Sequence, residues 1–271
     1  MKKVLVLAAA MMAAVMSAKA EVEFAYEAGA EVVSSYIWRG QYNGGLSFQP
    51  EGLVGFDALD GAIEFRGGLW ASLGASDWQW KADKGDGTGF TKFMPEIDFI
   101  ASFSAYGASV GFNEYYYCDD FSSATSEVWV GYNFGHFFGD AAGAYINWYT
   151  MVGGNDLNYD EATDTYSRAW SSYLELGYDY TFEDQGITIG AQVGMSPWTS
   201  DLYGNEKFAV TNISLKLNKE WEFEHMTLDL FAQGSLNPDG VNAQNAFIGK
   251  AGDDKLYMQK LNATLGLGIW F

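Results

Sequence analysis

The side chains best able to do chemistry in this sequence are carboxylates that recur at every second position. Glu96 and Asp98 form such a pair, and two carboxyl groups on one strand face can act as general acid and base, as in glycoside hydrolysis. Neighbouring acids in the wall of a water-filled interior show the same spacing. We favour this second interpretation, because nothing else in the sequence resembles a catalytic set.

Histidine, serine and cysteine patterns point away from catalysis and metal binding. The two histidines, His136 and His225, fall in segments that we expect to be short turns. The chain has no Gly-x-Ser-x-Gly elbow, phosphate loop or His-Glu-x-x-His motif. A lone Cys118 provides neither a disulfide framework nor a set of thiolate ligands. We therefore expect no enzyme, no cofactor and no metal centre.

Charge and the first residues indicate an exported protein. The 271 residues contain 35 Asp and Glu against 15 Lys and Arg, a net charge of −20 that repels nucleic acid. Residues 1–20 are typical of a signal peptide: Lys2 and Lys3 precede the apolar run 4–16, and Ala18-Lys19-Ala20 is a small-x-small cleavage site. We expect residues 21–271 to form the mature chain.

Beyond residue 20 the hydrophobic pattern has period two, which is typical of strands with one apolar and one polar face. In 23–39 the even positions are mostly apolar or aromatic, and every charged residue falls at an odd position. The even set is Phe24, Tyr26, Ala28, Ala30, Val32, Ser34, Tyr36 and Trp38, and the odd set includes Glu23, Glu27, Glu31, Ser35 and Arg39.

About twelve such segments predict an all-β fold, a single up-and-down antiparallel transmembrane β-barrel. Short connections alternate with long ones at 76–91, 153–166 and 237–255. We expect these long connections to form no independent fold. Aromatic residues gather near the ends of the apolar faces, as in Tyr36, Trp38 and Trp170, which is typical of the lipid-facing girdles at the two membrane interfaces. The chain ends in Phe271. A secreted soluble β-protein is the alternative. The segments are 23–40, 46–58, 62–75, 92–106, 108–118, 125–134, 141–152, 167–182, 187–198, 208–218, 226–236 and 256–271.

Alternation places a strongly acidic set of side chains inside this barrel, so we expect its interior to favour cations. For any single charge, however, we favour the simpler interpretation of a solvated or ion-paired wall residue. The inward acids are Glu23, Glu27, Glu31, Glu51, Asp57, Glu64, Glu96, Asp98, Glu127, Glu175, Asp179 and Asp229, and the inward bases are Arg39, Arg66, Lys216 and Lys260.

Arg39 is expected near the loop end of the first strand, facing inward and roughly opposite Ser47. Glu51 is the nearest inward acid on the next strand, and a loop carboxylate is an alternative partner. The guanidinium could orient a solute's carboxylate or phosphate by bidentate contact. An ion pair that pins the first hairpin is the other hypothesis.

Two acidic loops are weak candidates for divalent cations. Asp83-Lys84-Gly85-Asp86-Gly87 is a fragment of a calcium loop without the full spacing. Asn155-Asp156 with Asp160, Glu161 and Asp164 could meet ions that bridge lipopolysaccharide. We favour a solvated, mobile loop for this second run.

The segment Ser34-Ser35-Tyr36-Ile37-Trp38-Arg39-Gly40-Gln41 resembles the first hairpin of the TorF-type porin family, which carries Ser-x-Tyr-x-Trp-Arg-Gly. The likeness continues at 46–50, 68–72 and 96–99, and more loosely at 127–132 and 173–177. The stretch after Gln41 is shorter here, being Tyr42-Asn43-Gly44-Gly45. The resemblance implies an outer-membrane barrel with a pore role and no defined substrate.

These observations favour a narrow, cation-leaning channel for passive diffusion of small solutes in the outer membrane of a Gram-negative bacterium. A non-conducting barrel with a structural or surface-binding role is the alternative. The expected partners are outer-membrane lipid and lipopolysaccharide, the barrel assembly machinery through Phe271, and small solutes.

Overall fold

The computed structural model describes residues 22–74, 95–117, 124–139, 143–160, 162–200, 202–238 and 261–271. The expected signal peptide, the Asp83–Gly87 fragment, Cys118, Glu161 and Lys260 lie outside the described residues.

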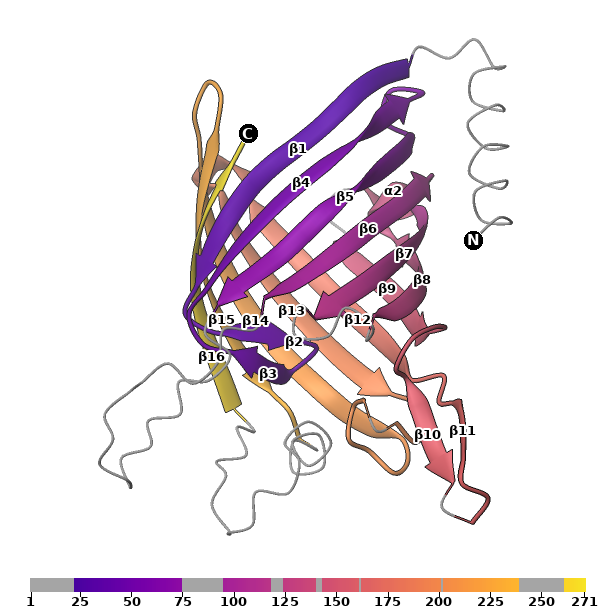
Figure 1. The fold of residues 1–271 in the computed structure, drawn as a ribbon. Helices are drawn as coiled ribbons and strands as arrows, with labels where there is room; N and C mark the ends of the chain where they lie inside the picture. Colours follow the sequence, from indigo (N-terminus) through magenta and orange to yellow (C-terminus); the bar gives the residue numbers. More distant parts are fainter. Residues whose placement is uncertain are drawn as a thin grey trace, which may run out of the picture.

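Twelve antiparallel strands close into a barrel in which each strand pairs with its neighbours in chain order and the last strand pairs with the first (Figure 1). The predicted fold class is therefore confirmed, and most boundaries fall within a few residues of those expected. The barrel strands are β1 (Val22–Val33), β4 (Ser47–Ala58), β5 (Ile63–Gly74), β6 (Glu96–Ala105), β7 (Ala108–Tyr117), β8 (Thr125–Asn133), β9 (Ala144–Met151), β12 (Ser172–Phe182), β13 (Ile187–Ser196), β14 (Ala209–Glu222), β15 (Thr227–Leu236) and β16 (Leu261–Trp270).

The period-two pattern decides which side chains face outward, because successive residues of a strand point to opposite faces. Large apolar side chains such as Phe24, Leu215 and Leu265 are more than half exposed. Polar side chains on the opposite face, such as Ser72 and Thr264, are buried. An apolar exterior around a polar interior is the reverse of a soluble fold and fits a barrel surrounded by lipid.

Among the described residues, the short turns lie at one end of the barrel and the β2–β3 and β10–β11 hairpins lie at the other (Figure 1). At the turn end, β6 and β7 are joined by Tyr106 and Gly107, both at positive φ (51° and 84°), as a two-residue hairpin turn requires. The same end holds the four-residue helix α2 (Gly135–Phe138) and the 3₁₀ turn η2 (Glu183–Gln185). Among the described residues, no helix is long and apolar enough to cross a bilayer.

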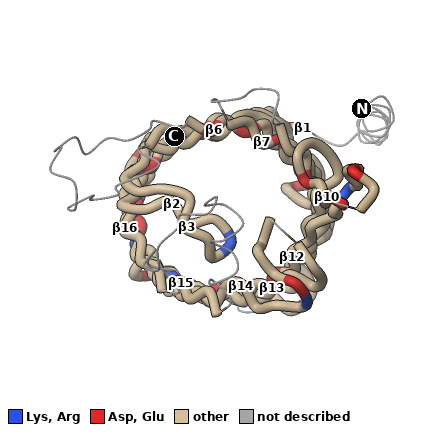
Figure 2. Tube along the Cα trace, turned by 60° about the horizontal axis from the view of Figure 1, so that its bottom comes forward, with Lys and Arg blue, Asp and Glu red and all other residues tan. Residues whose placement is uncertain are grey.

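The first strand ends earlier than the alternation predicts. β1 stops at Val33, and the chain then forms a separate hairpin of β2 (Tyr36–Trp38) and β3 (Gln41–Gly44). Figure 2 shows β2 and β3 inside the ring of barrel strands. The assignment of Tyr36 and Trp38 to a lipid-facing aromatic girdle is therefore wrong: both belong to a loop hairpin in the interior.

Ser34 and Ser35 explain why the chain turns inward, since both fasten the base of the hairpin to β16. The Ser34 Oγ accepts the Leu265 N–H at 2.9 Å, and the Ser35 Oγ donates to the Ala263 carbonyl at 2.7 Å. Thr264 adds a hydroxyl bond to the Ser35 carbonyl at 3.1 Å. These side-chain bonds compete with continuation of the β1–β16 ladder.

The connection between β9 and β12 also differs from expectation. It contains a hairpin of β10 (Leu157–Asp160) and β11 (Thr165–Arg168), where we expected a loop without its own fold. Trp170 precedes β12 rather than opening it, because that strand begins at Ser172. A cross-strand pair of Tyr159 and Tyr166, with ring centroids 5.0 Å apart, stabilises the hairpin.

Candidate functional site

The tip of the β2–β3 hairpin is pressed against the inner wall of the barrel. Arg39 and Gly40 form the turn at positive φ (50° and 82°). A Cβ added to Gly40 would lie 2.2 Å from the Thr211 carbonyl oxygen on β14, so only glycine fits this approach. The Gln41 amide donates to the Leu202 carbonyl at 3.0 Å.

Arg39 and Glu127 form a buried bidentate ion pair across the interior. The Arg39 Nη1 lies 2.6 Å from Oε2 of Glu127, and Nη2 lies 2.9 Å from Oε1. Their side chains are 8% and 0% exposed. Glu127, which projects inward from β8, also accepts bonds from the Tyr115 hydroxyl (2.8 Å) and the Asn113 amide (3.1 Å). The carboxylate is therefore fully bonded despite its burial.

Aromatic rings enclose the same guanidinium. The Arg39 Cζ lies 4.0 Å from the ring centroid of Tyr149, 4.6 Å from that of Trp38 and 4.9 Å from that of Tyr173, within the range of cation–π attraction. We call Trp38, Glu127, Tyr149, Tyr173 and Tyr203 the Arg39 cage. Burial is the largest single influence and lowers the pKa of the guanidinium. The charge and hydrogen bond of Glu127, together with Tyr203 and Tyr115, outweigh burial and raise this pKa well above its ordinary value.

Tyr203 completes the cage from a second inward-folded loop, residues 197–208 between β13 and β14. Its side chain is 0% exposed, and its hydroxyl accepts a hydrogen bond from Arg39 Nη1 at 2.6 Å. The ring stacks on Trp38 at 5.9 Å and on Tyr173 at 5.6 Å. The Ser200 Oγ holds the loop by accepting the Tyr203 N–H and donating to Ser171 Oγ. Two loops and the wall thus meet at one charge pair.

The other side of the hairpin covers a buried pair of acids. The Tyr36 ring lies 5.5 Å from that of Trp70 on β5, and its hydroxyl bonds Glu96. Burial, then the nearby carboxylates, raise the pKa of Tyr36 well above its ordinary value. Glu96 and Asp98 are 4% and 5% exposed, and Asp98 Oδ1 has no hydrogen-bond partner among the described residues. The two acids face the interior beneath a loop.

Toward the turn end, the interior side chains are more exposed to solvent. Arg66 on β5 bonds Asp57 through Nη1 at 2.6 Å and Glu27 through Nε at 2.6 Å. The Glu27 side chain is half exposed, at 51%. Glu64 is exposed and lies opposite Asp57 in the β4–β5 register. This ion-paired group is the solvated arrangement expected of wall residues.

Between these two regions lies a belt of acids with little cationic compensation. Glu175 bonds the amides of Asn147 and Gln192. Lys216 faces Glu31 and Asp179, and its ammonium lies 4.2 Å from the Phe231 ring centroid. Glu51 faces Glu27 and Glu31. Among the described residues of this belt, acids outnumber bases.

The expected neighbours of Arg39 are wrong. Ser47 pairs with Val33 on one side and Gly74 on the other, and Glu127 rather than Glu51 binds the guanidinium. The shift follows from the early end of β1, which removes Arg39 from the barrel ladder. Because Glu127 already binds both Nη atoms of Arg39, the guanidinium is not available to bind a solute carboxylate.

Sequence reasoning also missed the aromatic members of the cage. Tyr149 and Tyr173 lie two positions from Asn147 and Glu175 on their strands and so share the same inward face. Alternation alone was therefore enough to place them inside. Tyr203 lies in a loop without periodicity and carried no such signal.

Two acids of the loop run at 155–164 make hydrogen bonds in the structure. Asp156 is buried and its Oδ2 accepts the Ser171 N–H at 3.0 Å. Asp160 accepts bonds from Ala162 N–H and Thr163 Oγ1, both at 2.9 Å. Within the described part of the chain, no three His, Cys, Asp or Glu side chains are grouped as metal ligands would be.

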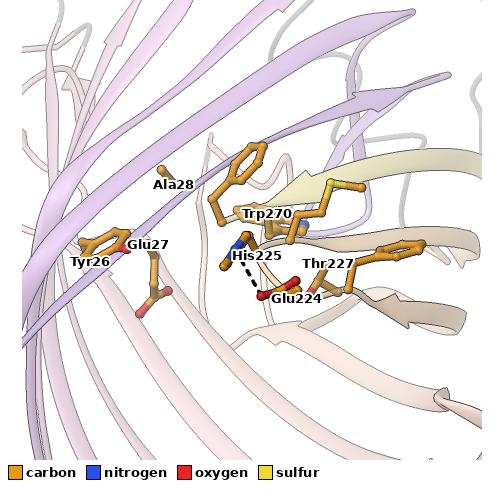
Figure 3. A pocket seen from close by; sticks show the side chains of 10 residues that line it. Tyr26, Glu27, Ala28, Glu224, His225, Thr227 and Trp270 are labelled. Atoms are coloured by element: carbon orange, nitrogen blue, oxygen red, sulfur yellow. Dashed lines mark ion pairs between the residues drawn. The ribbon is translucent and has the colours of Figure 1, made fainter.

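A groove of about 830 Å³ opens at the turn end, where β1 runs past the end of β16 (Figure 3). β1 pairs with β16 only over Gly29–Val33, although it pairs with β4 along its whole length. Beside the groove, His225 Nε2 lies 3.6 Å from Glu224 Oε1, and both side chains are more than 80% exposed. Such a solvated pair provides no enclosed site.

Comparison with known proteins gives weak likenesses of fold. No family model matches the sequence and no curated protein matches it, so membership of the TorF-type family is not confirmed. Among solved structures, the COG4313 outer membrane channel from Pseudomonas putida F1 is 12% identical, with 93% of this chain and 94% of that chain covered and a TM-score of 0.43. OmpF of Salmonella typhi in complex with daunomycin is 12% identical, with coverage of 93% and 98% and a TM-score of 0.38. At these scores the likenesses carry no argument about function.

Proposed function

We propose that this protein is an outer-membrane channel for passive diffusion of small solutes, whose conductance is set by the inward-folded β2–β3 hairpin. A closed barrel with an apolar exterior and a carboxylate-lined interior supports a membrane-spanning, water-filled passage. The carrying observation is the Arg39–Glu127 pair, which anchors a loop hairpin inside the barrel.

The position of the hairpin divides the interior into two parts. At the loop end, the side chains of Arg39, Glu127, Tyr173 and Tyr203 fill space and are almost completely buried. Toward the turn end, Glu27 and its neighbours remain accessible to solvent. Ions that enter from the turn end therefore meet their barrier at the hairpin.

The acidic belt supports a preference for cations. Glu127 neutralises Arg39 and Asp57 with Glu27 neutralises Arg66, so the inward bases other than Lys216 are paired within the described residues. The acids around Glu175 keep a negative field in a confined, low-dielectric space.

The short turns support a periplasmic location for the turn end, with the β10–β11 hairpin outside the cell. A protease site inserted within residues 155–164 tests this orientation. Cleavage on whole cells supports it, whereas cleavage only after rupture of the outer membrane contradicts it.

A non-conducting barrel is the second candidate, and the filled loop end is the observation that favours it. Purified protein in planar bilayers separates the two functions. The channel function predicts discrete conductance steps in potassium chloride that scale with protein added, and heat-denatured protein serves as the control. Absence of steps for the wild type and for a chain with residues 36–44 replaced by a short Gly/Ser linker would leave the non-conducting barrel.

A further inference from the structure

Arg39 is bound by the barrel in the way that a protein binds a separate guanidinium ligand. Its two Nη atoms match the two oxygens of Glu127, at 2.6 and 2.9 Å. Rings of Trp38, Tyr149 and Tyr173 lie against its planar group. Apart from Trp38, the cage residues come from elements remote in sequence from the hairpin that carries Arg39.

We propose that the cage is a recognition site for small guanidinium-bearing solutes, which the chain's own Arg39 occupies in the closed hairpin. This inference deepens the proposed channel function, on which it rests for the route by which a solute arrives. A solute with the same head group competes with Arg39 for Glu127 and thereby favours release of the hairpin.

The geometry selects a guanidinium over other charged groups. A bidentate carboxylate matches a planar fork of donors, whereas an ammonium offers a compact point charge. The stacked rings accept the flat face of the delocalised cation. Anions are disfavoured, because the buried Glu127 carboxylate would face them without compensation.

The Arg39 guanidinium makes short polar contacts at the hairpin tip, at 2.6–2.9 Å to Glu127 and Tyr203. The Gly40 carbonyl accepts long amide bonds from Asn237 (3.5 Å) and Asn262 (3.4 Å). Gln41 adds one bond of 3.0 Å to the neighbouring loop. Within the described residues these longer bonds hold the tip less tightly than the guanidinium does. A competitor for Glu127 therefore favours release of the tip, while Ser34 and Ser35 keep the base of the hairpin on β16.

Chemical rescue of an Arg39→Ala variant tests the site without any measurement of current. The variant leaves Glu127 buried beside a cavity of guanidinium shape. Ethylguanidinium at millimolar concentration should raise its unfolding temperature in detergent by about 2–4 °C once the concentration is about four times the Kd. Ethylammonium and sodium chloride at equal ionic strength should give no comparable rise.

Two further variants make the result specific to the cage. In Arg39→Ala/Glu127→Gln the carboxylate is gone, so ethylguanidinium should lose its effect. Arg66→Ala also removes a paired arginine, but its partners are solvated and the described structure places no ring over its guanidinium, so this variant should not be rescued. Equal stabilisation of all three variants, or none of Arg39→Ala, would overturn the proposal.

If Arg39→Ala does not fold unaided, the refolding yield replaces the unfolding temperature. The proposal predicts recovery of the heat-modifiable band with ethylguanidinium and not with ethylammonium; equal recovery, or none, overturns it. Because binding is measured in detergent, failure of rescue leaves the channel function standing, and absence of conductance leaves a positive rescue standing.

Discussion

The carboxylate of Glu127 on β8 binds both Nη atoms of Arg39, a loop residue that precedes it by 88 positions in the chain. The pair joins the first loop to the opposite part of the barrel wall, and Tyr203 adds a second loop to the same point. Because the pair is buried, removal of only one of the two charged side chains is costly: the remaining charge would be buried without a partner.

A double-mutant cycle should detect this coupling. Arg39→Ala and Glu127→Gln should each lower the free energy of unfolding, by about 3–5 kcal/mol for a variant that leaves one charge buried. The double variant should lose clearly less than the sum of the two. Urea unfolding in detergent measures all three, and strictly additive losses would contradict the direct pair.

Arg66→Ala is the matched control for that cycle. Arg66 also bonds two acids, but Glu27 is half exposed. We expect a loss of about 1 kcal/mol or less, as for solvated ion pairs.

Gly40→Ala should dislodge the hairpin. The substitution places a Cβ at positive φ and 2.2 Å from the Thr211 carbonyl oxygen. We expect faster hydrogen exchange of the 36–44 amides while the barrel strands keep their protection. Gly61→Ala is the control, since Gly61 has a similar φ of 80° with nothing within 4 Å. Equal effects of both variants on the hairpin would mean that the close approach to β14 is unimportant.

Cation preference should depend on the acidic belt and on salt. Reversal potentials under a potassium chloride gradient should show cation selectivity that weakens from about 0.1 M to 1 M salt, as the Debye length falls from about 10 Å to 3 Å. Glu175→Gln should reduce the selectivity, whereas Asp160→Asn should not, because Asp160 is exposed on the β10–β11 hairpin. Anion selectivity at low salt would contradict the proposed role of the belt.

The β10–β11 turn should weaken only in acid. Hydrogen bonds from the Thr163 hydroxyl and the Ala162 N–H lower the pKa of Asp160. Because the folded pKa lies below the unfolded one, the stabilisation is complete above the unfolded pKa of about 3.9 and is lost as pH falls through the lower folded value. Thr163→Val should raise the pKa of Asp160, which carboxyl-carbon NMR measures. An unchanged pKa would show that the hydroxyl bond is absent in solution.

The barrel was predictable from the sequence because its physical cause is local: a wall between lipid and water requires a period of two. The inward hairpin was not, because Tyr36, Trp38 and Arg39 continue the same alternation after β1 has ended. Alternation cannot distinguish a wall strand from a loop strand. The side chains of Ser34 and Ser35, which fasten the turn to β16, show their role only when that strand is in place.

The candidate site was predictable only in its wall residues. The period-two alternation places Glu127 inside the barrel. It does not predict which cation pairs with Glu127, because that partner depends on where the loop folds. Tyr203 enters the cage from a loop whose course depends on bonds such as Ser200 to Ser171. Contacts of this kind depend on the closed barrel and leave no periodic signal.

Single-channel conductance of the wild type and of Glu127→Gln, in the same bilayer and salt, tests the central claim most directly. If the Arg39–Glu127 pair holds the hairpin in the conducting path, Glu127→Gln should open more often or to larger steps than the wild type. The control Asp160→Asn, on the exposed β10–β11 hairpin, should behave like the wild type. Identical conductance and open times for Glu127→Gln and the wild type, both correctly folded, would show that the hairpin does not control the channel.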